Sequence, residues 1–244
     1  MKTVGIVGGI GPESTIEYYR LIIEAYRARQ SGTGGAPVDA QDARAASYPS
    51  IIINSVDLTQ LIKWINTNEF VKFTDCLVAA IEQLARAGAD FGALASNTPH
   101  IVFDEIRKRS PIPMISIVES ACDEAQARGL KRVGLFGTRF TMQGQFYPEV
   151  FARAGLHIIV PNDEEQSYIH GKYMGELLNN IFSPETHAGL LAIVDRLKER
   201  DDIEALILGG TELPLILRDG EHDGIPFLDT TRIHVARIVA ELVS

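Results

Sequence analysis

Short apolar runs alternate with longer stretches in which apolar residues recur at helical spacing, along the whole chain. The short runs are typical of buried strands, and the longer stretches are typical of amphipathic helices. This alternation predicts right-handed βαβ units on parallel sheets. The expected strands are 4–7, 51–54, 91–95, 114–117, 132–136, 157–160, 205–208 and 226–228, and the expected helices are 13–30, 70–87, 102–109, 121–127, 143–154, 168–181, 187–199 and 231–242.

The order of these elements predicts that the chain is built twice. Three pairs of segments match in the same order, namely 4–9 with 133–138, 95–98 with 209–212, and 114–117 with 227–230. We therefore predict an α/β fold of two pseudo-symmetric lobes, each a parallel sheet flanked by helices, with the active site in the inter-lobe cleft.

The lobe boundaries are expected near residue 118 and before the C-terminal helix. The first lobe is predicted to comprise 1–117 and 228–244, and the second lobe 118–227. Residues 31–48 have little periodicity and many Gly, Ala and Asp residues. Such a segment is either a surface insertion or a lid over the cleft, and the sequence leaves both open.

The overall composition is that of an ordinary globular protein, with 244 residues, 45% hydrophobic and 23% charged. The formal net charge of −9 argues against a nucleic-acid-binding protein, because phosphate contacts need a basic face. No segment approaches the roughly 20 apolar residues that cross a bilayer, and Met1 leads into the first strand without a signal-peptide pattern. We expect a cytoplasmic protein with no nucleic-acid partner and no membrane contact.

Neither the cysteines nor the histidines follow a metal-site pattern. Cys76 and Cys122 both lie in helical stretches and are expected to be reduced helix residues. The histidines are scattered, without acidic residues at ligand spacing, so no metal site is expected. They are His100, His157, His170, His187, His222 and His234.

Two polar segments give the strongest indication of a ligand site. Residues 95–100 and 208–214 each follow an apolar run and open into an amphipathic stretch. Each is therefore predicted to be the turn between a buried strand and a helix, where ligands bind in α/β sheets.

The glycine-rich segment 8–15 is predicted to be a third turn of this kind, and its backbone N–H groups favour an anion. Ser14 stands where a dinucleotide fingerprint needs glycine, and the Gly-Lys-Ser/Thr ending of a phosphate-binding loop is absent. A small carboxylate is the better ligand. Residues 137–141 repeat the turn, and the hydroxyls of this segment either bind a carboxylate or cap the helix.

The whole chain resembles the aspartate/glutamate racemase family, the cofactor-independent amino-acid racemases built of two pseudo-symmetric α/β lobes. Four motifs carry the resemblance, in the family's order over nearly the full length: Gly8-Gly9-Ile10-Gly11-Pro12-Glu13-Ser14-Thr15, Ser96-Asn97-Thr98-Pro99-His100, Gly137-Thr138-Arg139-Phe140-Thr141 and Gly210-Thr211-Glu212-Leu213-Pro214. The resemblance implies no cofactor, a small amino acid or related carboxylate as partner, and a homodimer.

The family's mechanism implies a cysteine at the front of each of two motifs, exchanging the α-proton from opposite faces of the substrate. This sequence has Ser96 and Gly210 at those two catalytic positions. A thiol has an unperturbed pKa of about 8.5 and can act as acid and base near neutral pH. A serine hydroxyl needs a strong partner for that role, and glycine has no side chain.

Other groups are candidates for the missing base. Glu212, two residues beyond Gly210, is either a replacement base or the structural carboxylate of a helix start. Asp57, His100 and Glu119 are further candidates, although Asp57 is also the expected N-cap of a helix through Leu61 and Trp64, and a structural role is the simpler interpretation of His100. A carboxylate whose pKa is raised by burial can serve as a general base, so a one-base reaction stays open.

The resemblance also implies which residues bind the substrate. Asn97, Thr98 and Thr211 are expected to hold its α-carboxylate and amino group. Tyr168 falls where members that act on acidic substrates often carry a basic residue, and Lys172 is expected to reach the same region from one helical turn later. The complete expected set is Gly9, Ile10, Asn54, Asn97, Thr98, Thr138, Tyr168, Lys172 and Thr211.

Three functions follow as hypotheses. The first is an amino-acid racemase-like isomerase that abstracts the Cα proton of a small acidic amino acid, aspartate or glutamate, at the lobe interface. The second is a lyase or decarboxylase of the same superfamily that does not racemise. The third is a catalytically inactive protein that binds a small acid.

Overall fold

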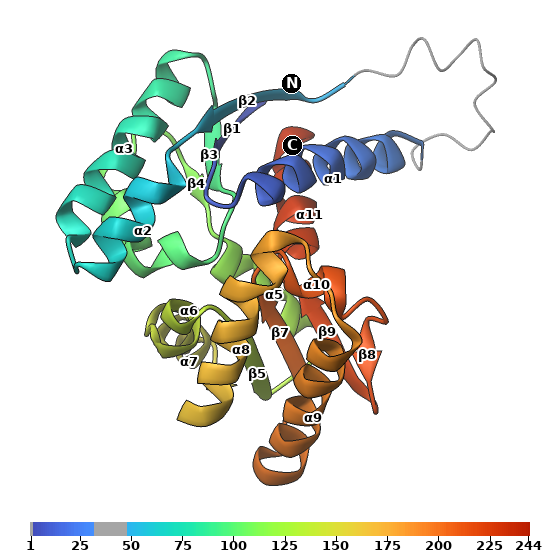
Figure 1. The fold of residues 1–244 in the computed structure, drawn as a ribbon. Helices are drawn as coiled ribbons and strands as arrows, with labels where there is room; N and C mark the ends of the chain where they lie inside the picture. Colours follow the sequence, from blue (N-terminus) through green and yellow to red (C-terminus); the bar gives the residue numbers. More distant parts are fainter. Residues whose placement is uncertain (1, 32–47) are drawn as a thin grey trace. The chain divides into compact units, whose positions relative to one another are not determined.

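The computed structural model describes residues 2–31 and 48–244, which form an α/β protein of two compact units (Figure 1). The first unit holds the described residues up to 95, together with 104–115 and 234–244. The second unit holds 96–103 and 116–233. The lobe boundaries expected from the sequence stay a prediction, and they differ from these units chiefly in where residues 96–103 belong.

The sheet of the first unit has the order β2-β1-β3-β4, and all of its strand pairs are parallel. Its buried core joins Val4 and Ile6 of β1 to Tyr18 and Ile22 of α1. The end of the C-terminal helix α11 belongs to the same core through Val239. The elements are β1 Thr3–Gly8, α1 Pro12–Ser31, β2 Ser50–Ser55, α2 Leu58–Asn66, α3 Phe70–Arg86, β3 Phe91–Leu94, α4 Phe103–Arg109, β4 Met114–Ile115 and α11 Thr230–Leu242.

The sheet of the second unit has the order β6-β5-β7-β9-β8, and only its edge strand β8 runs antiparallel. The elements are the 3-10 helix η2 Thr98–Val102, α5 Ile117–Ala127, β5 Arg132–Gly137, α6 Arg139–Gln143, α7 Phe146–Arg153, β6 His157–Ile159, α8 Asp163–Gly175, the 3-10 helix η3 Leu177–Asn179, α9 Pro184–Asp201, β7 Ala205–Gly209, α10 Leu213–Ile216, β8 Glu221–His222 and β9 Ile225–Asp229.

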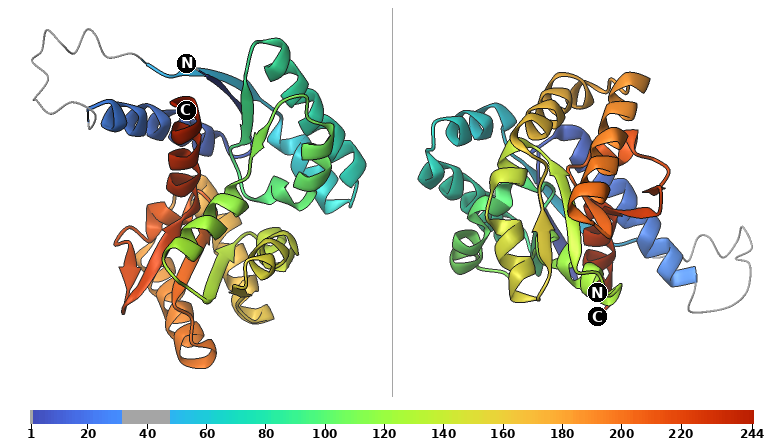
Figure 2. Two further views of the ribbon diagram at one scale, coloured as in Figure 1. Left: turned by 180° about the vertical axis from the view of Figure 1, so that it is seen from behind. Right: turned by 90° about the horizontal axis from the view of Figure 1, so that it is seen from below.

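Helices cover both faces of the sheet in the second unit, as two further views show (Figure 2). Side chains of a strand point to alternate faces, and the two cores follow this period. Ala205 and Ile207 of β7 pack with α5 and α7, whereas Leu206 and Leu208 pack with α8 and α9. Because both faces of β7 are buried, the residues of this strand form a continuous apolar run in the sequence.

The two units share one strand order, because β2-β1-β3-β4 in the first matches β6-β5-β7-β9 in the second. The segment pairs matched in the sequence place β1 with β5, β3 with β7 and β4 with β9. The predicted α/β fold with repeated parallel sheets flanked by helices is confirmed.

Several predicted elements are corrected. The helix expected over 143–154 is α7, which begins three residues later at Phe146, and a separate short helix, α6, ends at Gln143 before the extended backbone of Gly144. The helix expected over 168–181 begins at Asp163 and ends at Gly175, because Asn162 and Glu165 form a capping box that precedes the apolar pattern. The strand β8 was not predicted. It forms a hairpin with β9 that turns at Asp223 and Gly224, both with positive φ, and an Asp-Gly pair is typical of such turns.

Two other expectations concern local segments. Asp57 is the N-cap of α2, and its carboxylate accepts the N–H of Thr59 at 2.8 Å.

Residues 32–47 of the expected insertion or lid lie outside the described residues. Within the part of the chain that is described, no helix is long and apolar enough to cross a membrane.

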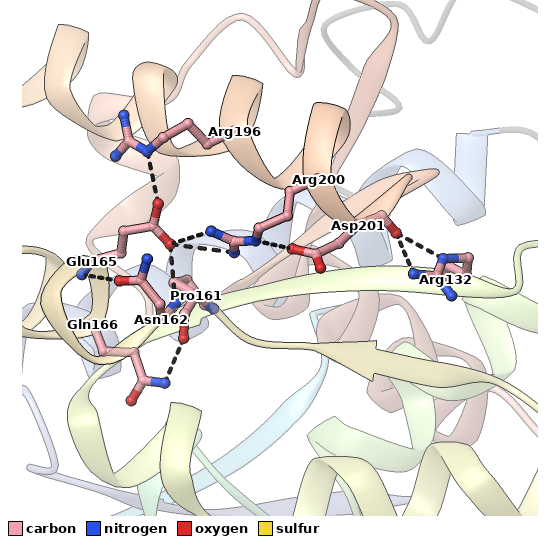
Figure 3. A network of polar contacts seen from close by, with 8 residues as sticks. All are labelled: Arg132, Pro161, Asn162, Glu165, Gln166, Arg196, Arg200 and Asp201. Carbon is pink, nitrogen blue, oxygen red and sulfur yellow. Dashed lines mark hydrogen bonds and ion pairs between the residues drawn. The ribbon is translucent and has the colours of Figure 1, made fainter.

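A buried carboxylate holds α8 to α9 in the second unit (Figure 3). Glu165 Oε1 accepts from Arg196 Nε at 2.7 Å, and Oε2 accepts from Arg200 at 3.4 Å and from the N–H of Asn162 at 3.0 Å. Burial alone would raise the pKa of the Glu165 carboxyl, but the hydrogen bonds from Arg196 and Asn162 and the charge of Arg200 outweigh it and lower the pKa.

Glu165→Gln is expected to lower the free energy of unfolding by about 1–3 kcal/mol at neutral pH, since charge-assisted hydrogen bonds are lost. The carboxyl's folded pKa lies below its unfolded value, so its stabilisation is present above the unfolded pKa and is lost as the pH falls through the folded pKa. Urea denaturation at several pH values should show the difference between wild type and variant shrinking below about pH 4. A difference that stays constant with pH would contradict this assignment.

Candidate active site

The candidate site lies at the carboxyl edge of the sheet in the second unit. Gly137 at the end of β5 and Gly209 at the end of β7 are paired in register. From β5 the chain continues to β6 on one side, and β7 lies on the other, so these two strands flank a topological switch point. Ligands of open α/β sheets bind at the carboxyl edge beside such a point.

Three threonine hydroxyls gather at this edge. Thr98 Oγ1 lies 3.2 Å from Thr138 Oγ1 and 3.5 Å from Thr141 Oγ1, and the last two oxygens are 3.1 Å apart. A Cβ added at Gly137 would stand 2.9 Å from Thr141, so the threonine group lies directly on the strand ends. Thr138 also caps α6, with its hydroxyl accepting the N–H of Thr141 at 3.3 Å.

Asn97 is buried and uses its amide to join other elements. Its Oδ1 accepts from the Tyr147 hydroxyl at 2.7 Å, and its Nδ2 donates to Thr230 Oγ1 at 3.2 Å. The Thr230 hydroxyl in turn donates to the carbonyl oxygen of Leu208 at 2.8 Å. This chain of bonds ties the residue before Thr98 to the end of β7.

Tyr147→Phe is expected to cost about 1–2 kcal/mol of unfolding free energy, because it leaves the buried Asn97 Oδ1 without its hydroxyl donor. The ring itself stays buried, so little packing is lost. Thermal or urea denaturation measures the effect, and Asn97→Ala made on the Tyr147→Phe background should then cost less than Asn97→Ala alone. Additive costs would show that the two side chains are not coupled.

His100 has a structural position. Its Nε2 accepts the N–H of Ile117 at 3.3 Å, which leaves Nδ1 to donate to the carbonyl oxygen of Asn97 at 3.2 Å. The ring is 3% exposed and stacks on Phe103 at 4.6 Å between centroids. His100 therefore orients the motif that contains Asn97 and Thr98.

Glu212 and Tyr173 form a second polar group, beyond the end of β7. The Tyr173 hydroxyl donates to Oε2 of Glu212, and Thr211 Oγ1 donates to the same oxygen at 2.9 Å. Both Tyr173 and Glu212 are buried. Burial and then the charge of Glu212 raise the pKa of the Tyr173 hydroxyl well above its usual 10.

The two positions expected to be catalytic both follow strands. Gly210 comes directly after β7, and Ser96 comes two residues after the end of β3. The two cysteines lie elsewhere, with Cys76 in α3 and Cys122 in α5. A catalytic role for positions 96 and 210 stays a prediction. Burial and the charges of Asp123 and Glu119 raise the pKa of the Cys122 thiol to about 11, which makes it a poor base at neutral pH.

The predicted binding residues of the first unit have local partners. The N–H of Gly9 donates to Thr15 Oγ1 at 2.8 Å, and the positive φ of 79° explains why glycine stands there. Ile10 is buried, and Asn54 Nδ2 donates to Ala80 O at 3.2 Å and to Gln83 Oε1 at 2.7 Å. Their part in substrate binding stays a prediction.

Tyr168 and Lys172 lie one turn apart on α8. Lys172 Nζ forms an ion pair with Glu176 Oε1 at 2.5 Å, and the Tyr168 ring packs so closely on Gly189 of α9 that a Cβ there would overlap its hydroxyl. Glu119, another candidate base, lies in the first turn of α5. Binding of a distal carboxylate by Tyr168 or Lys172 stays a prediction.

Two residues of the candidate site were not predicted from the sequence. Tyr147 and Tyr173 belong to no motif and extend from helices α7 and α8. Thr141 lies in the segment 137–141, whose hydroxyls were expected to bind a carboxylate or cap the helix. Among the described residues, no three His, Cys, Asp or Glu side chains are grouped so that they could hold a metal ion.

Comparisons with known proteins agree with this architecture. The family model for Asp/Glu/Hydantoin racemase matches residues 7–238. The broad specificity amino-acid racemase RacX of Bacillus subtilis is 26% identical over 233 residues, covering 93% of this chain and 92% of that protein.

Two solved structures are similar over 100% of both chains. One is an aspartate racemase homologue from Pyrococcus horikoshii, with a TM-score of 0.81 and 32% identity. The other is described as a putative Asp/Glu racemase from Yersinia pestis, with a TM-score of 0.87 and 27% identity. The chain therefore belongs to the Asp/Glu/Hydantoin racemase family.

Proposed function

We propose that the chain is a cofactor-independent, racemase-like isomerase that removes the Cα proton of a small acidic amino acid, aspartate or glutamate. The observation that carries the proposal is the group of Thr98, Thr138 and Thr141 hydroxyls at the strand ends of the second unit. Hydroxyl donors at the start of a helix suit the α-carboxylate of an amino acid.

Glu212 supports a proton-transfer role for the same edge. It is a buried carboxylate that follows β7, the strand paired with the one that leads into Thr138. Removing a proton next to a carboxylate requires a base in reach of Cα and donors that stabilise the charge developing on the carboxylate. The threonine hydroxyls are proposed as those donors, and Glu212 is proposed as the base, acting directly or through a side chain bonded to it.

The relatives support the choice of substrate class. The family model names aspartate, glutamate and hydantoin racemases, and the similar structure from Pyrococcus horikoshii is described as an aspartate racemase homologue. RacX is named a broad specificity amino-acid racemase, so neutral amino acids belong in any test. A homodimer in the cytoplasm remains part of the proposal by family resemblance.

Gly210 favours a second candidate. Racemisation by two bases needs a side chain on each face of the substrate, and glycine supplies none. A lyase or decarboxylase of the same superfamily needs only one proton-transfer group, and an inactive small-acid-binding protein needs none. Both alternatives remain unless another side chain transfers the proton on the face of the substrate where Gly210 has no side chain.

The test is hydrogen–deuterium exchange at Cα, followed by NMR in heavy water with aspartate, glutamate and a panel of neutral amino acids. We expect exchange with an acidic amino acid and formation of its mirror image. Exchange or product formation without inversion would favour the lyase or decarboxylase. Thermal stabilisation by a ligand with neither exchange nor product would identify a binding protein and remove the proposal.

A further inference from the structure

The space beside Gly210 is filled by a side chain from another helix. A Cβ added at Gly210 would stand 2.5 Å from Cε2, 2.6 Å from the hydroxyl oxygen Oη and 2.8 Å from Cζ of Tyr173. Non-bonded heavy atoms do not approach so closely without displacement. The phenol of Tyr173 therefore lies where the side chain of any other residue at position 210 would begin.

The hydroxyl in that space is already paired with a base. Tyr173 Oη donates to Oε2 of Glu212, two residues beyond Gly210, and Thr211 Oγ1 donates to the same oxygen at 2.9 Å. Tyr173 is 5% exposed and Glu212 is 4% exposed, so water competes little for this bond. A hydroxyl bonded to a carboxylate can accept a proton while it passes its own proton on.

We propose that Tyr173 and Glu212 form a proton relay that replaces the side chain missing at Gly210. This inference deepens the proposed function and rests on it. Tyr173 is the group that faces the substrate, and Glu212 is the group that stores the proton. Glycine at position 210 is what leaves room for the phenol.

The proposed step is balanced in protons and electrons. The Cα–H bond of the substrate breaks, and its electron pair stays on Cα and spreads into the α-carboxylate. The proton bonds to Oη of Tyr173 while the phenolic proton moves to Oε2 of Glu212, so Tyr173 stays neutral and Glu212 becomes a neutral acid. The reverse transfer from the same face returns a proton to Cα with its original configuration and restores the carboxylate, whereas protonation of Cα from the opposite face gives the mirror image.

A coupled transfer suits the burial of this pair. Burial and the neighbouring carboxylate raise the pKa of the Tyr173 hydroxyl, so a free phenolate is disfavoured there. In the relay no phenolate is formed, because the proton gained and the proton lost pass through the same oxygen. The charge that the substrate gains is the charge that Glu212 loses.

The relay is tested with Tyr173→Phe, which keeps the ring in place and removes only the hydroxyl. The measured quantity is kcat for deuterium exchange at Cα of the substrate found for the wild-type protein. We expect a loss of at least about 100-fold in kcat, with KM changed much less. Tyr18→Phe is the matched control, because it also removes a buried hydroxyl, which lies 2.8 Å from His234 Nδ1 in the first unit. Its kcat should stay within about 2-fold of wild type.

A double variant separates a relay from a structural hydrogen bond. Residues that act as one unit give non-additive losses, so Tyr173→Phe combined with Glu212→Gln should lose no more in kcat than the more damaging single variant. If Tyr173→Phe does not fold, Glu212→Gln tests whether Glu212 takes the proton, because the amide oxygen can still accept the Tyr173 hydrogen bond but cannot take the proton. A kcat unchanged from wild type in Glu212→Gln would overturn the relay.

Cα exchange by the wild-type protein tests the proposed function, and the variants at Tyr173 and Glu212 test the relay. If the wild-type protein exchanges the Cα proton and Tyr173→Phe retains at least a third of its kcat, the relay is wrong and the proposed function stands. Multiplying losses in the double variant also overturn the relay. If the wild-type protein exchanges the Cα proton of no amino acid, both the relay and the proposed function are rejected.

Discussion

Gly210→Ala is expected to lower the free energy of unfolding by about 1–3 kcal/mol, as overpacking of a filled interior does. The added methyl would stand 2.5 Å from Cε2 of Tyr173. The ring cannot easily yield, because its hydroxyl is bonded to Glu212 and its body belongs to the core between α8, α9 and the sheet. Urea denaturation of the two proteins measures the difference.

Gly171→Ala is the matched control for this prediction. Gly171 lies on α8, the helix of Tyr173, and a Cβ added there meets nothing within 4 Å. Alanine in a helix is favoured over glycine by about 0.5–1 kcal/mol, so this variant should be more stable than wild type. Equal effects of the two substitutions would show that Tyr173 does not close the space beside Gly210.

The same contact limits any attempt to build a two-thiol site. Cysteine at 96 and 210 would place a thiol at each of the positions that the family resemblance indicates, but Cys at 210 meets the phenol of Tyr173. A shorter residue at 173 would have to accompany the change. The cost of Gly210→Cys should therefore be smaller on a Tyr173→Ala background than in the wild-type protein, which a double-mutant cycle in unfolding free energy would reveal.

Glu212→Gln is expected to lower kcat for Cα exchange by about 100- to 10,000-fold, the range typical of a lost general base. The amide keeps the size of the carboxylate and can still accept from the Tyr173 hydroxyl, so the fold should be retained. The measurement is the rate of deuterium incorporation at saturating substrate, together with KM.

Glu165→Gln is the control for that substitution. It makes the same chemical change at another buried carboxylate of the second unit, bonded to Arg196 and Arg200 rather than to the candidate site. We expect it to reduce stability without a comparable loss of kcat. If both variants lose the same fraction of activity, the loss in Glu212→Gln reflects the fold and not proton transfer.

The strands and the repeat could be predicted from the sequence because both depend on the local pattern of apolar and polar residues. Apolar runs such as 205–208 mark strands that are buried on both faces, and they do so independently of what surrounds them. The motifs at residues 96–100 and 210–214 were located correctly after their strands for the same reason. Helix starts were less well placed where polar capping set them, as at Asn162 before α8.

The site was predictable only as far as its residues belong to the turns. Thr138 and Glu212 follow β5 and β7, which are parallel neighbours whose carboxyl ends lie at one edge of a sheet, whereas Thr98 follows β3 of the other sheet. Tyr147 and Tyr173 could not be found in this way. They bond to residues 50 and 39 positions away in the chain, from helices whose own pattern shows only that one face is buried.

By itself, the sequence determined the repeated alternation of strands and helices, the polar turns at the strand ends, and the absence of a thiol at positions 96 and 210. Only the tertiary structure decided what stands beside Gly210. Hydrophobic periodicity specifies which face of a helix is buried, but the contact between Tyr173 and Gly210 depends on how α8 packs against the sheet. The apolar pattern around Tyr173 on α8 therefore does not show that its ring occupies the space beside Gly210.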